Sequence, residues 1–308
     1  MLVIPVTGYD SRLRLFTFAL MISITPGSVS TGELHGHLLA AVAPRPIAFA
    51  STIGANGDVN LSPYSFFNVF SANPPVVIFS PARRVRDNTI KHTLENVMEV
   101  EEVVINIVSY SMVQQMSLSS TEYPKGVNEF EKAGFTQLAS ELVKPPRVAE
   151  SPVQLECKVL NVVALGDQGG AGNLVIAQVV KMHIDQSVMD QDNKIDPEKL
   201  DAVARMGGPW YSRAKAGMFK VPKPIRTLGI GVDQIPEPIR NSTILTGNDL
   251  GQLGNVEQLP SGVVSTSFME AHHPDILIQG NQNEKHNLAK QYIAKGDVAL
   301  AWKVLLSN

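Results

Sequence analysis

The chain has 308 residues, of which 44% are hydrophobic and 18% charged, so it is long enough for one or two globular domains with a sizeable core. The formal net charge of −3 argues against general nucleic-acid binding, which needs a basic protein surface. The single cysteine, Cys157, excludes an internal disulfide bond and suits a reducing compartment.

Residues 1–20 allow two interpretations. Arg12 and Arg14 precede an apolar run over residues 15–22, which resembles the hydrophobic part of a secretion signal. The run is too short to span a bilayer, and no clean small-x-small cleavage site follows it. Alternatively, Met21 is the natural start, and residues 1–20 precede the folded part. We favour the second interpretation and expect a cytoplasmic protein without a membrane span.

The next part of the chain predicts closely spaced strands. The expected elements are a helix over residues 31–41 and strands over residues 47–53, 59–61 and 76–80. Thr31 would cap the helix. Residues 54–58 predict a hairpin turn, because Asn56 and Gly57 tolerate the positive φ that tight turns require.

A basic segment follows the third strand and reads Arg83-Arg-Val-Arg-Asp-Asn-Thr-Ile-Lys91. Ile90, Leu94 and Val97 have helical spacing, so we expect a helix over residues 88–97, capped by Asp87 or Asn88. The N-terminus of a helix leaves N–H groups unpaired and carries a partial positive charge, which favours phosphate. The alternative is a solvated basic loop.

Strands also dominate the prediction for the second half of the barrel region. We expect strands over residues 103–108, 153–165 and 174–184, and helices over residues 112–118, 129–133 and 196–205. The glycine-rich residues 166–173 are interpreted as a hairpin turn, because a nucleotide-binding loop would be followed by a helix and here a strand follows. Many strands with few helices between them favour an antiparallel barrel over a doubly wound sheet.

The C-terminal part differs in character. Residues 221–265 are expected to be extended and loop-rich, and residues 284–306 predict a helical hairpin broken at Gly296 and Asp297. The predicted organisation is therefore an N-terminal extension (1–20), a barrel domain (21–220) and a C-terminal extension (221–308). The fold class is mainly β, an antiparallel β-barrel with flanking short helices and a helical end.

Small polar residues follow two of the strands and make candidate ligand contacts. Residues 60–65 offer hydroxyl, amide and backbone groups that could pair with the edge of a planar ring, and Ser80 ends the third strand. An ordinary turn is the alternative. Together with the basic segment, these residues suit a planar ring with a phosphate tail.

Five motifs in order resemble those of the flavin reductase-like family, whose FMN-binding domain is a split β-barrel. The motifs are Arg45-Pro-Ile-Ala-Phe-Ala-Ser-Thr52, Asn60-Leu-Ser-Pro-Tyr-Ser-Phe-Phe-Asn68, Asn73-Pro-Pro75, Asn88-Thr-Ile-Lys91 and residues 144–157. The resemblance covers residues 30–220, and within the family the chain is most similar to the flavoredoxin-like branch.

The resemblance implies non-covalent FMN at a homodimer interface. Carried over, the ring would be lined by Asn60, Ser62, Tyr64 and Ser65, with Thr52 beside it and Tyr211 near it. The ribityl phosphate would be held by Ser80, Arg84, Thr89 and Lys91, with Arg83 and Arg86 as alternatives to Arg84. No catalytic acid–base cluster and no metal site are expected.

The function expected from this resemblance is that of an FMN-dependent flavin reductase, in which NADH or NADPH passes hydride to FMN. Two alternatives stay open: a flavoredoxin-type electron carrier that serves a redox partner protein, and a non-catalytic FMN-binding module. The family pattern does not cover residues 1–20 or the helical end after about residue 265, and these parts would either lengthen the dimer interface or cover the site. The role of residues 221–308 stays open.

Overall fold

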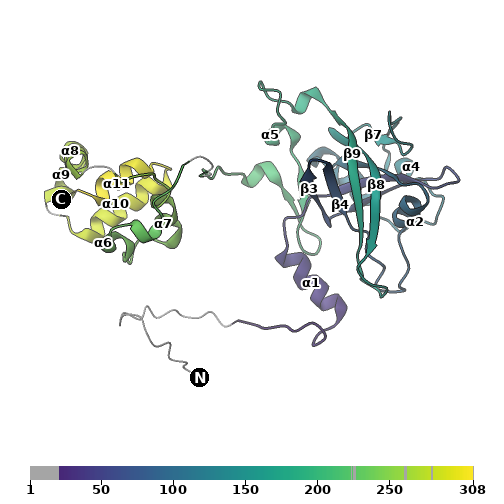
Figure 1. Ribbon diagram of the computed structural model, residues 1–308, viewed down its shortest axis with the longest axis horizontal. Helices are drawn as coiled ribbons and strands as arrows, with labels where there is room; N and C mark the ends of the chain where they lie inside the picture. Colours follow the sequence, from purple (N-terminus) through teal and green to yellow (C-terminus); the bar gives the residue numbers. More distant parts are fainter. Residues whose placement is uncertain (1–20, 223, 225–226, 260–261, 279, 308) are drawn as a thin grey trace. The chain divides into compact units, whose positions relative to one another are not determined.

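The computed structural model describes residues 21–222, 224, 227–259, 262–278 and 280–307 (Figure 1). The chain divides into two compact units, Met1–Met218 and Phe219–Asn308. Each unit has an apolar core of its own. The expected N-terminal extension, residues 1–20, lies outside the described residues.

An antiparallel sheet of seven strands forms the first unit. Its strands are β1 (Ala48–Ile53), β2 (Val59–Tyr64), β3 (Phe67–Ala72), β4 (Pro75–Phe79), β5 (Glu102–Ile107), β8 (Val153–Ala164) and β9 (Asn173–Ile184). They pair in the order β2-β1-β5-β8-β9-β4-β3. Two short ladders join β6 (Gln137–Leu138) to β7 (Arg147–Val148), and β10 (Val203–Arg205) to β11 (Tyr211–Arg213). The prediction of a mainly antiparallel β fold is confirmed.

The two edges of this sheet meet at one corner. The edge strands are β2 and β3, which do not pair with each other, yet only Ser65 and Phe66 lie between them in the chain. Two residues span less than about 11 Å, so the sheet must curl until its edges meet at this link. Away from the link the edges diverge, which makes the barrel split. We call the corner at Ser65 and Phe66 the seam.

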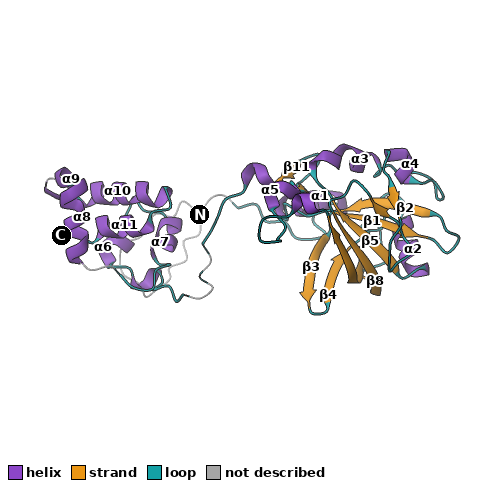
Figure 2. Cartoon of the chain, turned by 90° about the horizontal axis from the view of Figure 1, so that it is seen from above, coloured by secondary structure: helices purple, strands orange, loops and turns teal. Residues whose placement is uncertain are grey.

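Short helices accompany the sheet in the first unit. They are α1 (Thr31–Ala41), α2 (His92–Glu99), α3 (Val113–Leu118), α4 (Glu129–Ala133) and α5 (Pro197–Leu200). Of these, α2, α3 and α4 contact strands of the sheet. Figure 2 shows α3 and α4 over β1 and β2, where both helices contact β2. Side chains of β1 alternate between two cores, with Ala48 and Ala50 packing in one and Phe49 in the other. Burial on both faces makes this part of the sheet rigid.

The hairpin predictions are confirmed, and several boundaries differ. Gly57 has φ 91° in the turn between β1 and β2, and β8 and β9 form the predicted long hairpin. The segment expected as a polar loop over residues 60–65 is mostly strand β2. Its Pro63 is tolerated because β2 is an edge strand. Strand β3 was missed because most of its residues are exposed and show no alternation.

Left-handed residues shorten two predicted helices. Asn88 has φ 57°, so α2 begins at His92 rather than near residue 88, and its N-cap is Lys91 rather than Asp87 or Asn88. Asp201 has φ 48° and ends α5 at Leu200, so the last part of the helix predicted over residues 196–205 is strand β10. The cap of α1 is Ser30, which accepts a hydrogen bond from the Glu33 N–H, rather than Thr31.

The second unit is helical. Its helices are α6 (Glu237–Arg240), α7 (Gly247–Leu253), α8 (Gly262–His272), α9 (Pro274–Ile278), α10 (Gln282–Ala294) and α11 (Val298–Leu305). The predicted hairpin of α10 and α11 is confirmed, with φ 83° at Gly296 between them. The expectation of a loop-rich stretch over residues 221–265 is wrong where α6 and α7 lie. The core centres on buried Trp302, whose indole N–H donates to the Leu253 carbonyl at 3.0 Å.

Across the part of the chain that the structure describes, every helix is too short or too polar to cross a membrane.

Candidate functional site

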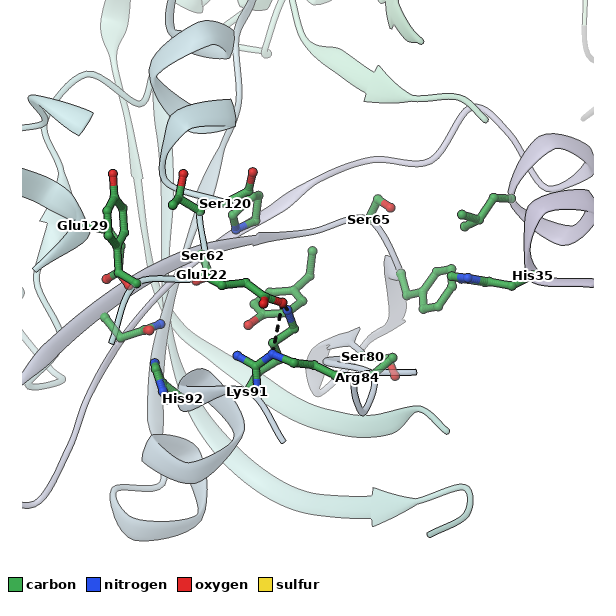
Figure 3. Close-up of a pocket in the computed structure, with 18 residues that line it drawn as sticks. His35, Ser62, Ser65, Ser80, Arg84, Lys91, His92, Ser120, Glu122 and Glu129 are labelled. Atoms are coloured by element: carbon green, nitrogen blue, oxygen red, sulfur yellow. Dashed lines mark hydrogen bonds and ion pairs between the residues drawn. The ribbon is translucent and has the colours of Figure 1, made fainter. Parts of the chain in front are cut away.

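A cavity of about 280 Å³ opens at the seam of the barrel (Figure 3). Its walls come from β2, from the link to β3, from the segment that joins β4 to α2, and from the loop between α3 and α4. The volume lies near the lower end of the roughly 300–1,000 Å³ that is typical of small-molecule sites. Because β2 ends at the seam and the segment after β4 begins beside it, residues far apart in sequence face one space.

Seven of the ten site residues expected from the sequence line this cavity: Asn60, Ser62, Tyr64, Ser65, Ser80, Arg84 and Lys91. Thr52, Thr89 and Tyr211 are not among its lining residues. Thr52 is fully buried in β1 and accepts a hydrogen bond from the Asn96 amide at 3.1 Å. Tyr211 lines a different cavity, with Tyr110, and its ring lies under the Arg205 guanidinium at 4.6 Å.

Thr89 does not line the cavity, but it contacts Arg84, which does. Its hydroxyl accepts a hydrogen bond from Arg84 Nη1 at 2.9 Å and donates to Asp87 Oδ1 at 2.6 Å. Arg84 Nη1 also donates to the Ile90 carbonyl at 2.6 Å. Thr89 therefore orients the guanidinium that lines the cavity.

The strand side of the cavity, which we define as Asn60, Ser62, Tyr64 and Glu129, is ordered by buried hydrogen bonds. The Thr93 hydroxyl oxygen accepts from the Asn60 amide at 2.7 Å and from the Tyr64 hydroxyl at 2.8 Å. Burial raises the pKa of Tyr64 to about 12, so this hydroxyl stays protonated at neutral pH. Thr93 lies in the first turn of α2, and the network thus ties that helix to β2.

Glu129 is a nearly buried carboxyl at one end of the cavity. Its Oε2 accepts a hydrogen bond from the Leu61 N–H at 2.9 Å, which joins the start of α4 to β2. Burial raises the pKa of Glu129 above its ordinary value, because the charged form loses hydration there. Burial likewise lowers the pKa of the neighbouring His92, which favours a neutral imidazole. Burial thus disfavours the charged form of both groups.

The cationic side, which we define as Ser80, Arg84, Lys91 and Glu122, has the opposite character. Arg84 and Lys91 reach the cavity from the segment between β4 and α2, and Glu122 reaches it from the loop between α3 and α4. Figure 3 shows these three side chains meeting. The buried Ser80 hydroxyl has no hydrogen-bond partner among the described residues. A polar ligand with negative charge would suit the Ser80 hydroxyl and the two cations.

The choice among the three arginines follows from their contacts. Arg83 turns away from the cavity, and its Nε and Nη2 donate to the Asn88 side chain at 2.6 Å and to the Asn88 carbonyl at 2.7 Å. Arg86 is largely exposed and does not line the cavity. Arg84 is the arginine that lines it.

The turn between β8 and β9 supports the cationic side from behind. The Gly170 N–H donates to the Arg83 carbonyl at 3.0 Å, and the Asn88 amide donates to the Asp167 carbonyl at 2.9 Å. A Cβ on Gly169 would lie 3.0 Å from the Arg84 and Val85 carbonyl oxygens. The glycine run therefore allows close packing of two backbones and does not itself line the cavity.

Buried Arg45 holds α1 against the seam. Its guanidinium donates to the carbonyls of Leu39, Val42 and Met206 and, at 3.4 Å, to the Ser65 hydroxyl. Through these bonds the C-terminal end of α1 is fixed beside the link between the edge strands.

Sequence reasoning missed several lining residues, chiefly His35, Leu39, Phe66, His92, Ser120, Thr121, Glu122, Tyr123 and Glu129. His35 and Leu39 belong to a helix in which no residue is buried, so no amphipathic pattern marked the face toward the cavity. Glu122 lies in an irregular loop without a motif. For Glu129 the sequence offered a local indication, because Glu129 is the first residue of a predicted helix and directly follows Asn128, which caps it.

A family model described as a flavin reductase like domain matches residues 40–197. An uncharacterized protein of Aquifex aeolicus is 37% identical over 181 residues, which make up 59% of this chain and 90% of that protein. An uncharacterized protein of Halalkalibacterium halodurans is 39% identical over 194 residues, 62% of this chain and 92% of that protein.

Two solved structures resemble the first part of the chain. Nitrilotriacetate monooxygenase component B from Bacillus cereus aligns with a TM-score of 0.62 at 29% identity, over 66% of this chain and all of that one. A protein from Shewanella frigidimarina, described as a candidate flavin reductase with a split barrel domain, aligns with a TM-score of 0.55 at 25% identity. That alignment covers 64% of this chain and 95% of the other.

Proposed function

The chain belongs to the flavin reductase-like family, and on this premise we propose that it binds FMN non-covalently and oxidises NADH or NADPH. The observation that carries the proposal is the division of one cavity into two chemically different sides. A strand side ordered by buried hydrogen bonds adjoins a cationic side on which the Ser80 hydroxyl lacks a partner among the described residues.

The residues present fit the two ends of FMN. Asn60, Ser62 and Ser65 offer hydrogen-bonding groups of the kind that the polar edge of a flavin ring requires. Ser80, Arg84 and Lys91 offer a hydroxyl and two cations, which suit the ribityl phosphate. Thr89 would act by orienting Arg84. The structure supports no contact from Thr52 or Tyr211 to a ligand in this cavity.

FMN, when bound, would supply the electron-accepting group, and the chain would bind and orient it. The strand side would hold the ring in one orientation, because hydrogen bonds within the chain fix Asn60 and Tyr64. Tyr64 keeps its proton at neutral pH and adds no charge to the ring environment. The proposal requires no catalytic acid or base from the chain.

The proposal includes a homodimer. Large apolar side chains are exposed along β8 and β9, namely Leu160, Val163, Val180 and Met182, and a second copy would cover such surface. Light scattering of the purified protein at several concentrations measures the oligomeric state directly, and a monomer throughout would contradict this part.

The test of function combines a spectrum with an assay. The purified protein is mixed with FMN, unbound flavin is removed, and flavin absorbance bands that stay with the protein are expected. Added NADH or NADPH should then be oxidised, followed at the nicotinamide absorbance. Bound FMN without oxidation of either nucleotide would favour an electron carrier, and a protein that binds no FMN would overturn the proposal.

Lys91→Ala tests the position of the phosphate. We expect weaker FMN binding by roughly 1–3 kcal/mol, because a charge-assisted contact is lost. Lys125→Ala is the matched control, since Lys125 pairs with Glu95 at 2.8 Å and does not line the cavity. Equal affinities for the two variants would show that the phosphate lies elsewhere.

A further inference from the structure

One carboxylate sits among three cationic side chains at the edge of the cavity. Glu122 Oε1 lies 3.1 Å from Arg84 Nε and 3.5 Å from Lys91 Nζ, and Glu122 Oε2 lies 3.2 Å from Arg86 Nη2. The cations come from the segment between β4 and α2, whereas Glu122 comes from a separate loop. Hydrogen bonds from Arg84 and Arg86 lower the pKa of Glu122, so it stays ionised at neutral pH.

A carboxylate and a phosphate compete for the same partners. Both present anionic oxygens to guanidinium and ammonium groups, and Arg84 and Lys91 are the cations that we assign to the ribityl phosphate. Arg84 Nε cannot donate its single hydrogen fully to Glu122 and to a phosphate at once. Arg84 Nη1 is engaged by Thr89 and Ile90, so a bidentate contact to a phosphate can use only the Nε–Nη2 edge, and there the phosphate must displace the Glu122 carboxylate.

Arg84 would keep its position when Glu122 leaves. Arg84 Nη1 is held by the Thr89 hydroxyl and the Ile90 carbonyl, and neither bond involves Glu122. Asp87, the other nearby carboxylate, is engaged by the Thr89 N–H at 3.1 Å and by Arg86 at 3.0 Å. Glu122 itself is 45% exposed, so its side chain can turn into solvent without loss of core packing.

On the basis of the proposed function, we propose that Glu122 is a specificity-determining residue, an internal counter-ion that the phosphate of the flavin must displace. It lowers the affinity for phosphorylated flavins and leaves that for riboflavin unchanged, because riboflavin has no phosphate. The chain thus holds FMN less tightly than its cations alone would allow, which favours exchange of the flavin.

Glu122→Gln tests this assignment, because the amide keeps the shape and removes the charge. Kd values for FMN and for riboflavin are measured by quenching of flavin fluorescence. We expect Glu122→Gln to bind FMN roughly tenfold more tightly than the wild type, since the cost of displacing the carboxylate is gone. The Kd for riboflavin should stay within about twofold, a difference close to the resolution of such measurements.

Glu131→Gln is the matched control. Glu131 is exposed, lies at the start of α4, accepts a bond from Asn128, and does not line the cavity. It makes the same change in net charge and should alter neither Kd. Thermal unfolding of both variants checks that the fold is retained, and Glu122→Ala serves as a second variant with the same expectation for FMN.

The outcomes separate two failures. If the wild type binds neither flavin, the proposed function falls, and this inference falls with it. If the wild type binds FMN but Glu122→Gln binds it equally or more weakly, Glu122 does not compete with the phosphate and the inference alone is overturned. An equal gain for FMN and riboflavin also overturns it, because Glu122 would then act on the ring or the ribityl chain.

Discussion

The two sides of the cavity are stabilised in different ways. On the strand side, polar groups bond to one another in buried surroundings, as Asn60 and Tyr64 do at the Thr93 hydroxyl. On the cationic side, charges are paired across partly exposed contacts, and the Ser80 hydroxyl lacks a partner among the described residues. Exposed ion pairs contribute little to stability, whereas buried hydrogen bonds are costly to break. Side chains of the strand side should therefore contribute more to stability than those of the cationic side, which should contribute more to ligand binding.

Gly169→Ala should have the largest effect, because it disturbs the support of the cationic side. The added Cβ would meet the backbone of Arg84 and Val85 at 3.0–3.1 Å, and backbone atoms cannot move aside cheaply. We expect a loss of about 1–3 kcal/mol in the free energy of unfolding, typical of overpacking, and weaker FMN binding. Urea unfolding measures the first and a fluorescence titration the second. Gly217→Ala, with open space around its Cβ, is the control and should change neither.

Tyr64→Phe tests the strand side, where we expect a substitution to affect stability more than FMN binding. It removes the hydroxyl that donates to Thr93 and keeps the ring packed against Phe79, whose centroid is 5.5 Å away. The expected loss is about 0.5–1.5 kcal/mol in the free energy of unfolding. FMN affinity should fall less than it does in Lys91→Ala. If Tyr64→Phe leaves stability unchanged and abolishes binding, the division between the two sides is wrong.

Glu129→Gln tests the strand side through the pH dependence of folding stability. Because the folded-state pKa of Glu129 lies above its ordinary value of 4.5, the carboxyl favours folding below that value. This contribution is lost as the pH rises through the raised pKa. The variant has no carboxyl to titrate at this position. The difference between its melting temperature and that of the wild type should therefore shift in favour of the variant as the pH rises from about 4 to about 7. A constant difference across that range would contradict the assignment.

Ser80→Ala should have the smallest effect on stability, and its two readouts should differ. The Ser80 hydroxyl is buried without a partner among the described residues, so its removal should leave the free energy of unfolding unchanged or slightly higher. FMN binding should weaken by roughly 10- to 100-fold, because a hydrogen bond to the charged phosphate is lost. A clear loss of stability would mean that Ser80 bonds within the protein.

Local patterns in the sequence predicted much of the fold. Asn56 and Gly57 marked the first hairpin, the glycine run marked the long one, and Gly296 marked the helical hairpin near the C-terminus. Each of these signals depends on backbone conformation over a few residues, which the local sequence controls. The helices expected to begin near Asn88 and to continue past Asp201 failed for the same kind of reason, since single left-handed residues interrupt them.

The sequence by itself determined the antiparallel barrel class, the helical end of the chain and seven of the residues that line the cavity, because these follow from periodicity, turn chemistry and ordered motifs. Only the tertiary structure decided which residues meet there. It turned Arg83 away and Arg84 inward, placed Thr89 behind Arg84, and excluded Thr52 and Tyr211 from the cavity lining. It also brought Glu122 to the cations, because the curled sheet joins loops that lie about 30 residues apart and share no local pattern.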